Sequence, residues 1–171
     1  GQMPHMVPSG KDFQEVMLSN GGFDGLTADG KFFRGWDKLS GYLKTAFNGA
    51  AHIDTEEKHS GLASMRLENK TAGDIVQVSQ NVAAEAESFG GGRTYRLSAW
   101  LKTGKLARPN GINFGVFAPG LKSTGQGGQL KFPAPGSGWQ RVAADFTMPD
   151  SAELLRVMCH VSGEAVVWVD E

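Results

Sequence analysis

The sequence contains a single cysteine, Cys159, so it cannot form an internal disulfide. It also lacks an apolar run near the ~18 residues that a membrane-spanning helix needs. Neither sign of charge is in excess, because 17 Lys and Arg oppose 18 Asp and Glu, and the basic residues form no cluster. Binding to nucleic acids and electrostatic attachment to membranes both depend on clustered Lys and Arg. We therefore expect neither a nucleic acid nor a membrane as partner.

The lone cysteine lies in a segment of alternating side chains. A strand over residues 155–161 would place Leu155, Val157, Cys159 and Val161 on one face and Arg156, Met158 and His160 on the other. A cysteine on the apolar face of such a strand is expected to be a buried, unreactive thiol.

The sequence also shows no pattern typical of a long amphipathic helix. Instead, apolar residues recur at every second position. Segments 65–68, 76–82, 95–102, 112–117 and 141–146 alternate apolar residues with polar or small ones. This period puts one side of a strand on a core and the other toward solvent, as in antiparallel sheets. Together with 24 glycines for turns, it predicts an all-β fold, a two-sheet antiparallel β-sandwich. The jelly roll is the version of that fold that also hosts lectin domains.

The length of the chain suits one domain. At 171 residues with 40% hydrophobic residues, it can bury a sizeable core. Residues 1–10 lack the apolar segment of a secretory signal peptide, and we expect them to be a cloning remnant or a linker. No internal repeat divides the rest of the sequence. We therefore expect residues 11–171 to form a single β-sandwich module.

Five short motifs stand in a recognisable order and spacing. They are Asn-Gly-Gly-Phe-Asp at 20–24 followed by Trp36, His-Ser-Gly at 59–61, and the segments 95–102, 138–149 and 166–171. Over about residues 16–171, this set resembles carbohydrate-binding modules of the family 4/9 and family 22 type, which have a galactose-binding-like jelly-roll fold. The resemblance implies a non-catalytic, sugar-binding β-sandwich. It also implies a secreted or cell-surface location and covalently linked catalytic or anchoring domains.

The resemblance further implies one structural calcium ion where the first and last strands meet. In the family, the ligands are a carboxylate of the first motif, carbonyls of the loop before the next strand, and an acid near the end of the last strand. Asp24, Ser60 in the loop 59–61, and Asp170 match these positions. Ca²⁺ takes about six to eight oxygen ligands, including carboxylates and carbonyls. The alternative is that Asp24 is a turn residue and Asp170 a solvated strand end.

A sugar site needs two kinds of side chain. A sugar ring has an apolar C–H face, which a flat aromatic ring can cover, and a rim of hydroxyls, which Asn, Gln, Asp, Glu and Arg can bind. The alternation places several such side chains on outward strand faces, and Trp36 lies in a loop where related modules often place a binding residue. The predicted carbohydrate-binding residues are Trp36, Arg66, Glu68, Asp74, Gln77, Trp100 and Phe117.

Several of these candidates also have a structural interpretation. Trp36 can plug the edge of the sandwich, because Trp is usually mostly buried, and Trp100 belongs to a stretch typical of the family framework. Arg66 and Glu68 can form a surface ion pair of little energetic weight. Some xylan-binding relatives have an aromatic platform where this sequence has Asp74. This departure argues against xylan, and Asp74 either binds hydroxyls or caps a turn.

The sequence thus predicts a non-catalytic module that binds a polysaccharide or oligosaccharide. One alternative is a structural or adhesion module of the same fold that binds no sugar, since fold alone does not establish function. A second alternative is a polysaccharide-cleaving enzyme on a jelly roll. A hydrolase needs a pair of carboxylates at its centre, and the sequence shows no such pairing.

Overall fold

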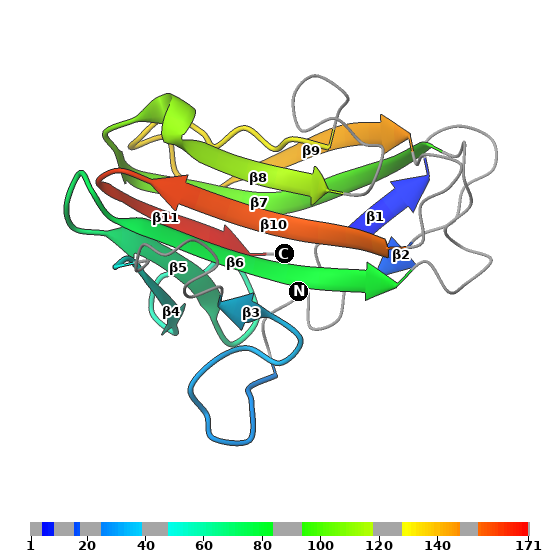
Figure 1. Cartoon of the computed structure of the whole chain (residues 1–171), viewed down its shortest axis with the longest axis horizontal. Helices are drawn as coiled ribbons and strands as arrows, with labels where there is room; N and C mark the ends of the chain where they lie inside the picture. The colour runs from blue at the N-terminus through cyan, green and yellow to red at the C-terminus, as the bar shows by residue number, and fades with distance from the viewer. Residues whose placement is uncertain are drawn as a thin grey trace.

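The computed structural model describes residues 5–8, 16–17, 25–38, 48–83, 94–117, 128–147 and 154–170. Within these ranges the chain forms strands and one short 3₁₀ helix, η1 (Figure 1). The elements are β1 (His5–Pro8), β2 (Val16–Met17), β3 (Asp37–Lys38), β4 (Ala50–Asp54), β5 (Ser64–Asn69), β6 (Ile75–Ala83), β7 (Thr94–Leu106), η1 (Pro109–Gly111), β8 (Ile112–Phe117), β9 (Gln140–Thr147), β10 (Leu154–Ser162) and β11 (Ala165–Asp170).

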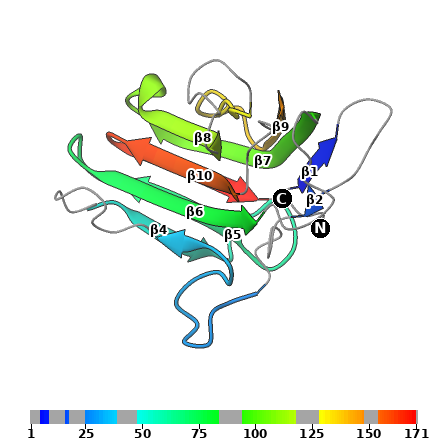
Figure 2. The same cartoon turned by 45° about the vertical axis from the view of Figure 1, so that its right-hand side comes forward.

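The strands form two antiparallel sheets. The large sheet has the order β2-β1-β7-β11-β5-β4, with β9 also paired to β7, and the small sheet has the order β3-β6-β10-β8. Figures 1 and 2 show β8, β10 and β6 side by side as one layer. The prediction of a two-sheet antiparallel β-sandwich is confirmed.

Strand β7 organises the large sheet because it is paired along both of its edges. Its first eight residues pair with β9 from Thr94↔Thr147 to Leu101↔Gln140. On the other edge, β1 and β11 follow one another along β7. The last strand of the chain is therefore central in the large sheet, between β7 and β5.

The core lies between the sheets and follows the two-residue alternation. Most inward residues of β5, β6, β7 and β8 are buried, as the sequence pattern predicts, whereas on β9 Phe146 is buried and Val142 and Ala144 are partly buried. Cys159 is also buried, as predicted, and its burial raises the pKa of the thiol well above its ordinary range. The buried inward residues include Met65, Leu67, Val76, Val78, Tyr95, Leu97, Ala99, Leu101, Phe114, Val116 and Phe146.

One strand of the large sheet lies within residues 1–10. Residues 5–8 form β1, which pairs with β7 from His5↔Ser98 to Pro8↔Tyr95 and with β2 at His5↔Met17. These four residues are therefore part of the large sheet. Backbone N–H and C=O groups make this ladder, so the segment joins the sheet without an alternating side-chain pattern that would have predicted it.

A buried amide links the two sheets at the turn between β10 and β11. Asn69 of β5 is 1% exposed, and its Nδ2 donates to the carbonyls of Val161 and Gly163, both at 2.9 Å. Gly163 has a φ of 85°, a backbone conformation that favours glycine, and its N–H donates to the carbonyl of Asp74 at 3.0 Å. The chain passes from the small sheet to the large sheet at this turn, so Asn69 fixes where the sheets meet.

The described ranges contain no helix that is long and apolar enough to cross a membrane.

Replacing Asn69 by Ala should destabilise the protein. The change leaves the carbonyls of Val161 and Gly163 without the donor that Asn69 supplies, in a buried place. We expect the free energy of unfolding, measured by urea denaturation, to fall by about 1–3 kcal/mol. Asn113→Ala is the matched control, because Asn113 is exposed on β8 and its loss should change stability little. Equal losses for the two variants would contradict the link.

Candidate functional site

The residues predicted to bind carbohydrate do not share one surface. Arg66, Glu68 and Trp100 lie in the large sheet, whereas Gln77 and Phe117 lie in the small sheet. Each is followed or preceded by buried core residues, so each points outward. The outer sides of two packed sheets face opposite directions. The tryptophan face of the large sheet comprises Arg66, Glu68, Trp100, Lys102, Trp139 and Trp168, and the polar face of the small sheet comprises Gln77, Ser79, Asn113, Phe117, Arg156, Met158 and His160.

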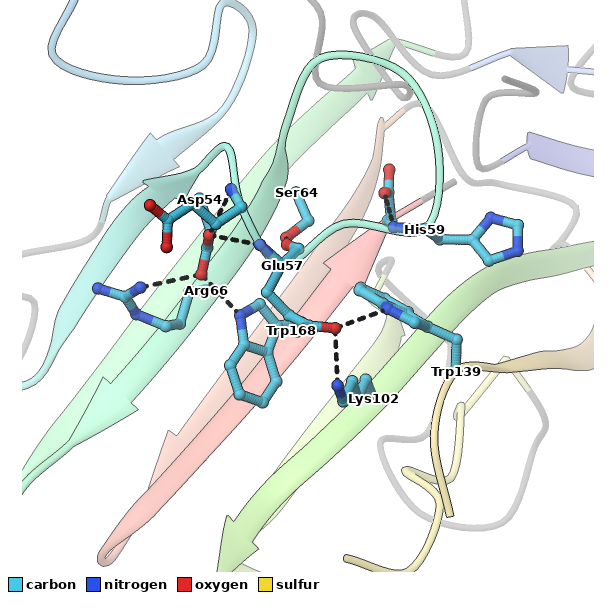
Figure 3. Close-up of polar contacts among 10 residues, drawn as sticks. Asp54, Glu57, His59, Ser64, Arg66, Lys102, Trp139 and Trp168 are labelled. Carbon is cyan, nitrogen blue, oxygen red and sulfur yellow. Dashed lines mark hydrogen bonds and ion pairs between the residues drawn. The ribbon is translucent and has the colours of Figure 1, made fainter. Parts of the chain in front are cut away.

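On the tryptophan face, Asp54 at the end of β4 accepts four hydrogen bonds (Figure 3). Its Oδ2 accepts from Trp168 Nε1 and Arg66 Nη1, both at 2.9 Å. Its Oδ1 accepts from the backbone N–H groups of Glu56 at 3.0 Å and Glu57 at 2.9 Å. Burial raises the pKa of Asp54, but the bonds from Trp168, Glu57, Glu56 and Arg66 outweigh it and hold the pKa below the ordinary 3.8. Asp54 thus holds the loop after β4 against the sheet.

Glu57, in that same loop, is a second acceptor on this face (Figure 3). Its Oε1 accepts from Lys102 Nζ at 2.6 Å and from Trp139 Nε1 at 3.0 Å. Lys102 Nζ also lies 5.5 Å from the centre of the Trp168 ring. A Cβ atom at Gly104 would come within 2.9 Å of the Trp168 ring, so glycine leaves the space that this indole occupies. Two carboxylates and two indole N–H groups are therefore bonded to partners inside the protein.

The loop 59–61 meets the end of the last strand. Asp170 Oδ2 accepts the backbone N–H groups of His59 at 2.8 Å and Ser60 at 3.1 Å, and Asp170 is fully buried. A solvated strand end is therefore the wrong interpretation of Asp170. The His59 ring stacks on Trp100, with ring centres 3.8 Å apart and planes 14° apart. Asp24, the other acid of the implied calcium site, lies outside the described residues.

The described ranges contain no group of three or more His, Cys, Asp or Glu side chains placed to hold a metal ion. A calcium site here would therefore depend on Asp170, on loop carbonyls and on residues outside those ranges. The buried Asp170 carboxylate beside the loop of Ser60 fits one ligand of a hard cation.

The polar face has a hydrogen-bonded pair on its two central strands. His160 Nδ1 of β10 lies 2.6 Å from Gln77 Oε1 of β6, and the two residues are directly paired in register. Gln77 is only 7% exposed although it points away from the core, and Ser79, two residues further along β6, is also buried. Polar side chains thus occupy positions that are both outward and covered.

The register orders the rest of the polar face into rows across the strands. His160 stands between Gln77 and Asn113, and Met158 between Ser79 and Gly115. Arg156 pairs with Phe117 in the next row, where the aromatic ring is partly exposed. The rows therefore carry amide, imidazole and guanidinium groups together with one aromatic ring.

Gln129 adds an amide to this face. A Cβ at Gly115 would lie 2.4 Å from Gln129 Nε2, so the glycine leaves room for the Gln129 side chain to pass over β8. The backbone of the next residue, Leu130, bonds to the Phe114 carbonyl at 2.6 Å, which holds this segment against the strand.

Two predicted binding residues have other surroundings. Trp36 is 5% exposed and belongs to the core cluster, so its ring offers no open face for a sugar; this corrects its proposed role and agrees with the edge-plugging interpretation. Asp74 Oδ2 accepts the backbone N–H groups of Lys70 at 3.0 Å and Thr71 at 2.9 Å, so Asp74 caps a turn. Hydrogen bonds from Thr71 are the main cause that lowers the pKa of Asp74.

Sequence reasoning selected only Gln77 and Phe117 of the polar face; it did not select His160, Asn113 or Gln129, among others. The alternation over 155–161 did place His160 away from the core, and that over 112–117 did the same for Asn113. The missing information was the pairing partner, because register between β6, β8 and β10 brings these side chains beside Gln77. For Gln129, no local pattern existed.

Comparison with protein families decides the classification. The family model described as a carbohydrate binding domain, of the 4/9 type, matches residues 16–165. The chain belongs to this carbohydrate-binding family. The predicted resemblance is therefore confirmed, and the protein is a carbohydrate-binding module by family. No curated protein matches the chain.

Solved structures share the fold at low sequence identity. The xylan-binding domain CBM22-1 of Xyn10C from Paenibacillus barcinonensis has a TM-score of 0.56 and 15% identity, with 88% of this chain and 87% of that chain covered. The CBM22-1–GH10 modules of xylanase 10B from Clostridium thermocellum, complexed with xylohexaose, have a TM-score of 0.52 and 14% identity, with 80% of this chain and 25% of that chain covered. The enzymatically active domain of tailspike protein 4 from bacteriophage CBA120 has a TM-score of 0.58 and 14% identity, with 90% of this chain and 20% of that chain covered. At these identities the likeness concerns the fold.

Replacing Asp54 by Asn should make stability less dependent on pH. A carboxyl group whose pKa is lowered by folding stabilises the native state above its unfolded pKa, and this contribution disappears as the pH falls through the folded pKa. We expect Asp54→Asn to melt below the parent at neutral pH, and the gap to close toward about pH 3. Thermal melts across this range measure it.

The matched control is Asp145→Asn, which alters an exposed ion pair with Arg96. This change should have little effect at any pH. A gap between Asp54→Asn and the parent that stays constant with pH would show that the Asp54 charge contributes nothing.

Proposed function

We propose that this module binds a polysaccharide or oligosaccharide through the polar face, without catalysis, and thereby keeps an attached domain close to it. Family membership supports carbohydrate as the ligand class. One structural neighbour consists of a module joined to a GH10 module and complexed with xylohexaose, which supports an attached catalytic domain as one arrangement. A polysaccharide outside the cell would be met by a secreted or surface-bound protein, and we propose that location.

The polar face suits hydroxyl groups better than the tryptophan face does. On the tryptophan face, the carboxylates of Asp54 and Glu57 already bond to Trp168 and Trp139. A sugar hydroxyl that bonded to these carboxylates would have to replace those bonds, and breaking a satisfied contact costs free energy. On the polar face, Asn113 is exposed, and the amide residues Gln77 and Asn113 lie on either side of His160.

The observation that carries the proposal is the pairing of Gln77 with His160 at the centre of the outward face of the small sheet. Binding sites hold a few polar groups at defined positions beside apolar surface. Here the pair provides the oriented polar groups, while Met158 and the partly exposed ring of Phe117 provide apolar surface for the C–H side of a sugar. The face contains no described pair of carboxylates of the kind a glycoside hydrolase uses.

Replacing Gln77 by Ala should weaken binding while the fold persists. Soluble β-glucans, xylans and mannans form the panel, with affinity electrophoresis as the first test and calorimetry on any ligand that retards the protein. We expect dissociation constants between about 1 mM and 1 µM for the parent. Losing one well-made hydrogen bond of about 1.4 kcal/mol should raise the constant roughly tenfold.

The matched control for that experiment is Glu68→Ala, because Glu68 lies on the opposite face of the sandwich. It should bind as the parent does. Weakened binding in Glu68→Ala with unchanged binding in Gln77→Ala would move the site to the tryptophan face. A blank panel would favour a structural or adhesion role, and release of reducing sugar would indicate an enzyme.

We also propose a structural calcium ion beside Asp170, with carbonyl oxygens of the loop around Ser60 and the carboxylate of Asp24 as further ligands. The support is the buried Asp170 carboxylate, which lies against the loop expected from the family pattern. Such an ion would tie the first motif, this loop and the last strand together.

Removing calcium should lower the melting temperature, because a ligand that binds only the native state stabilises it by mass action. Chelator added to the purified protein tests this, with calcium in excess as the reversal. Asp170→Asn keeps an oxygen that can accept the His59 and Ser60 hydrogens but loses the charge, so chelator should no longer affect this variant. Melting curves of the parent that do not respond to chelator or calcium would refute the ion.

A further inference from the structure

We propose that His160 is a positioning residue for the sugar site: its Nδ1–H holds the amide oxygen of Gln77, so that the Gln77 NH₂ group is presented to a hydroxyl or ring oxygen of an uncharged saccharide. This inference rests on the proposed function and names the atoms that would bind the ligand. On the tryptophan face, by contrast, the carboxylates of Asp54 and Glu57 already bond to the indoles of Trp168 and Trp139.

The direction of the hydrogen bond follows from the two atoms that face each other. Gln77 Oε1 carries no hydrogen, so the bond of 2.6 Å requires the hydrogen to be on His160 Nδ1. The oxygen end of the Gln77 amide is therefore occupied. Its nitrogen end, which carries two hydrogens, donates to no acceptor in the part of the chain that the structure describes.

The covered position of Gln77 makes this orientation matter. A glutamine on an open surface samples many rotamers, and fixing such a side chain on binding costs conformational entropy. Gln77 is 7% exposed and lies between buried Val76 and Val78. With its oxygen held by His160, the amide is already in one orientation before a ligand arrives, so less entropy is lost on binding.

The residues that pair with His160 in register carry no charge. Burial lowers the pKa of His160 from 6.5, so the ring is uncharged at neutral pH. In its own row the described neighbours are Gln77 of β6 and Asn113 of β8, both uncharged. The charged residues that share the described face stand further off: Asp37 is on edge strand β3, where it pairs with Ser79, and Arg156 is four residues along β10.

The neutral pair indicates the ligand chemistry. An amide NH₂ is a donor, and hydroxyl and ring oxygens of neutral sugars are acceptors that it can bind without desolvating a charge. We therefore expect the site to take uncharged hexose or pentose chains, with the Gln77 nitrogen on an oxygen acceptor.

Two substitutions at His160 separate positioning from simple packing. His160→Asn places an amide nitrogen close to where Nδ1 stands, so it keeps the donor to Gln77, whereas His160→Leu fills similar space without a donor. With the best ligand from the glycan panel, we expect His160→Leu to bind about tenfold more weakly and His160→Asn to bind within about threefold of the parent. Gln77→Leu should lose as much as His160→Leu, and the double Leu variant should lose no more than either.

Equal weakening by His160→Asn and His160→Leu, or losses at the two positions that multiply, would overturn the proposal. If His160→Leu does not fold, His160→Gln replaces it, because its amide nitrogen lies where Nε2 stands and cannot reach Gln77 in the same way. Melting temperatures of all variants show which of them fold.

A second measurement needs no ligand. Nitrogen-15 NMR of the parent should show a neutral His160 ring with the hydrogen on Nδ1, and a Gln77 side-chain NH₂ that is ordered in the parent and mobile in His160→Leu. A hydrogen on Nε2 alone, or an equally mobile Gln77 in both proteins, would overturn the positioning role. If these signals appear as expected but no glycan binds, the proposed function is wrong, whereas the ordering of Gln77 by His160 is confirmed.

Discussion

The alternation of side chains along β10 is the constraint on which both the core and the polar face depend. Val157, Cys159 and Val161 enter the core, and Arg156, Met158 and His160 stand on the other side of the same strand. A shift of one residue in its pairing with β6 or β8 would exchange these two sets. Burial of the apolar set is therefore what holds His160 opposite Gln77, so the energy that stabilises the sandwich also sets the geometry of the outer face.

The sequence was sufficient for the strands and the core because alternation is a local property of the chain. It was not sufficient for the site, because membership of a sheet is not local. Arg66 and Gln77 have the same outward signature in sequence, yet β5 and β6 belong to different sheets, so the two side chains point to opposite sides of the molecule. The prediction that Trp36 binds a sugar was wrong for a related reason. Trp36 lies in a loop, and a loop has no side-chain alternation from which its burial could be inferred.

The hydrogen bonds of the tryptophan face could not be predicted either, since they join residues far apart in sequence. Trp139 donates to Glu57 and Trp168 to Asp54, over separations of 82 and 114 residues. The family resemblance pointed to the contact between Asp170 and the loop 59–61, because it compares whole patterns rather than neighbouring residues. The resemblance did not predict the partners of the carboxylates of Asp54 and Glu57, which accept hydrogen bonds from indole and backbone N–H groups.

The buried amide of Asn69 has a consequence for production of the protein in a secretory pathway. Asn69-Lys70-Thr71 has the sequence of an N-glycosylation acceptor. In the folded protein, the nitrogen that would carry the glycan is the one that bonds to Val161 and Gly163 inside the sandwich. A glycan attached before folding would take one of its hydrogens and place a bulky group where the sheets must close. Modification and folding therefore compete for the same atom, and only the unmodified chain can complete the β10–β11 corner.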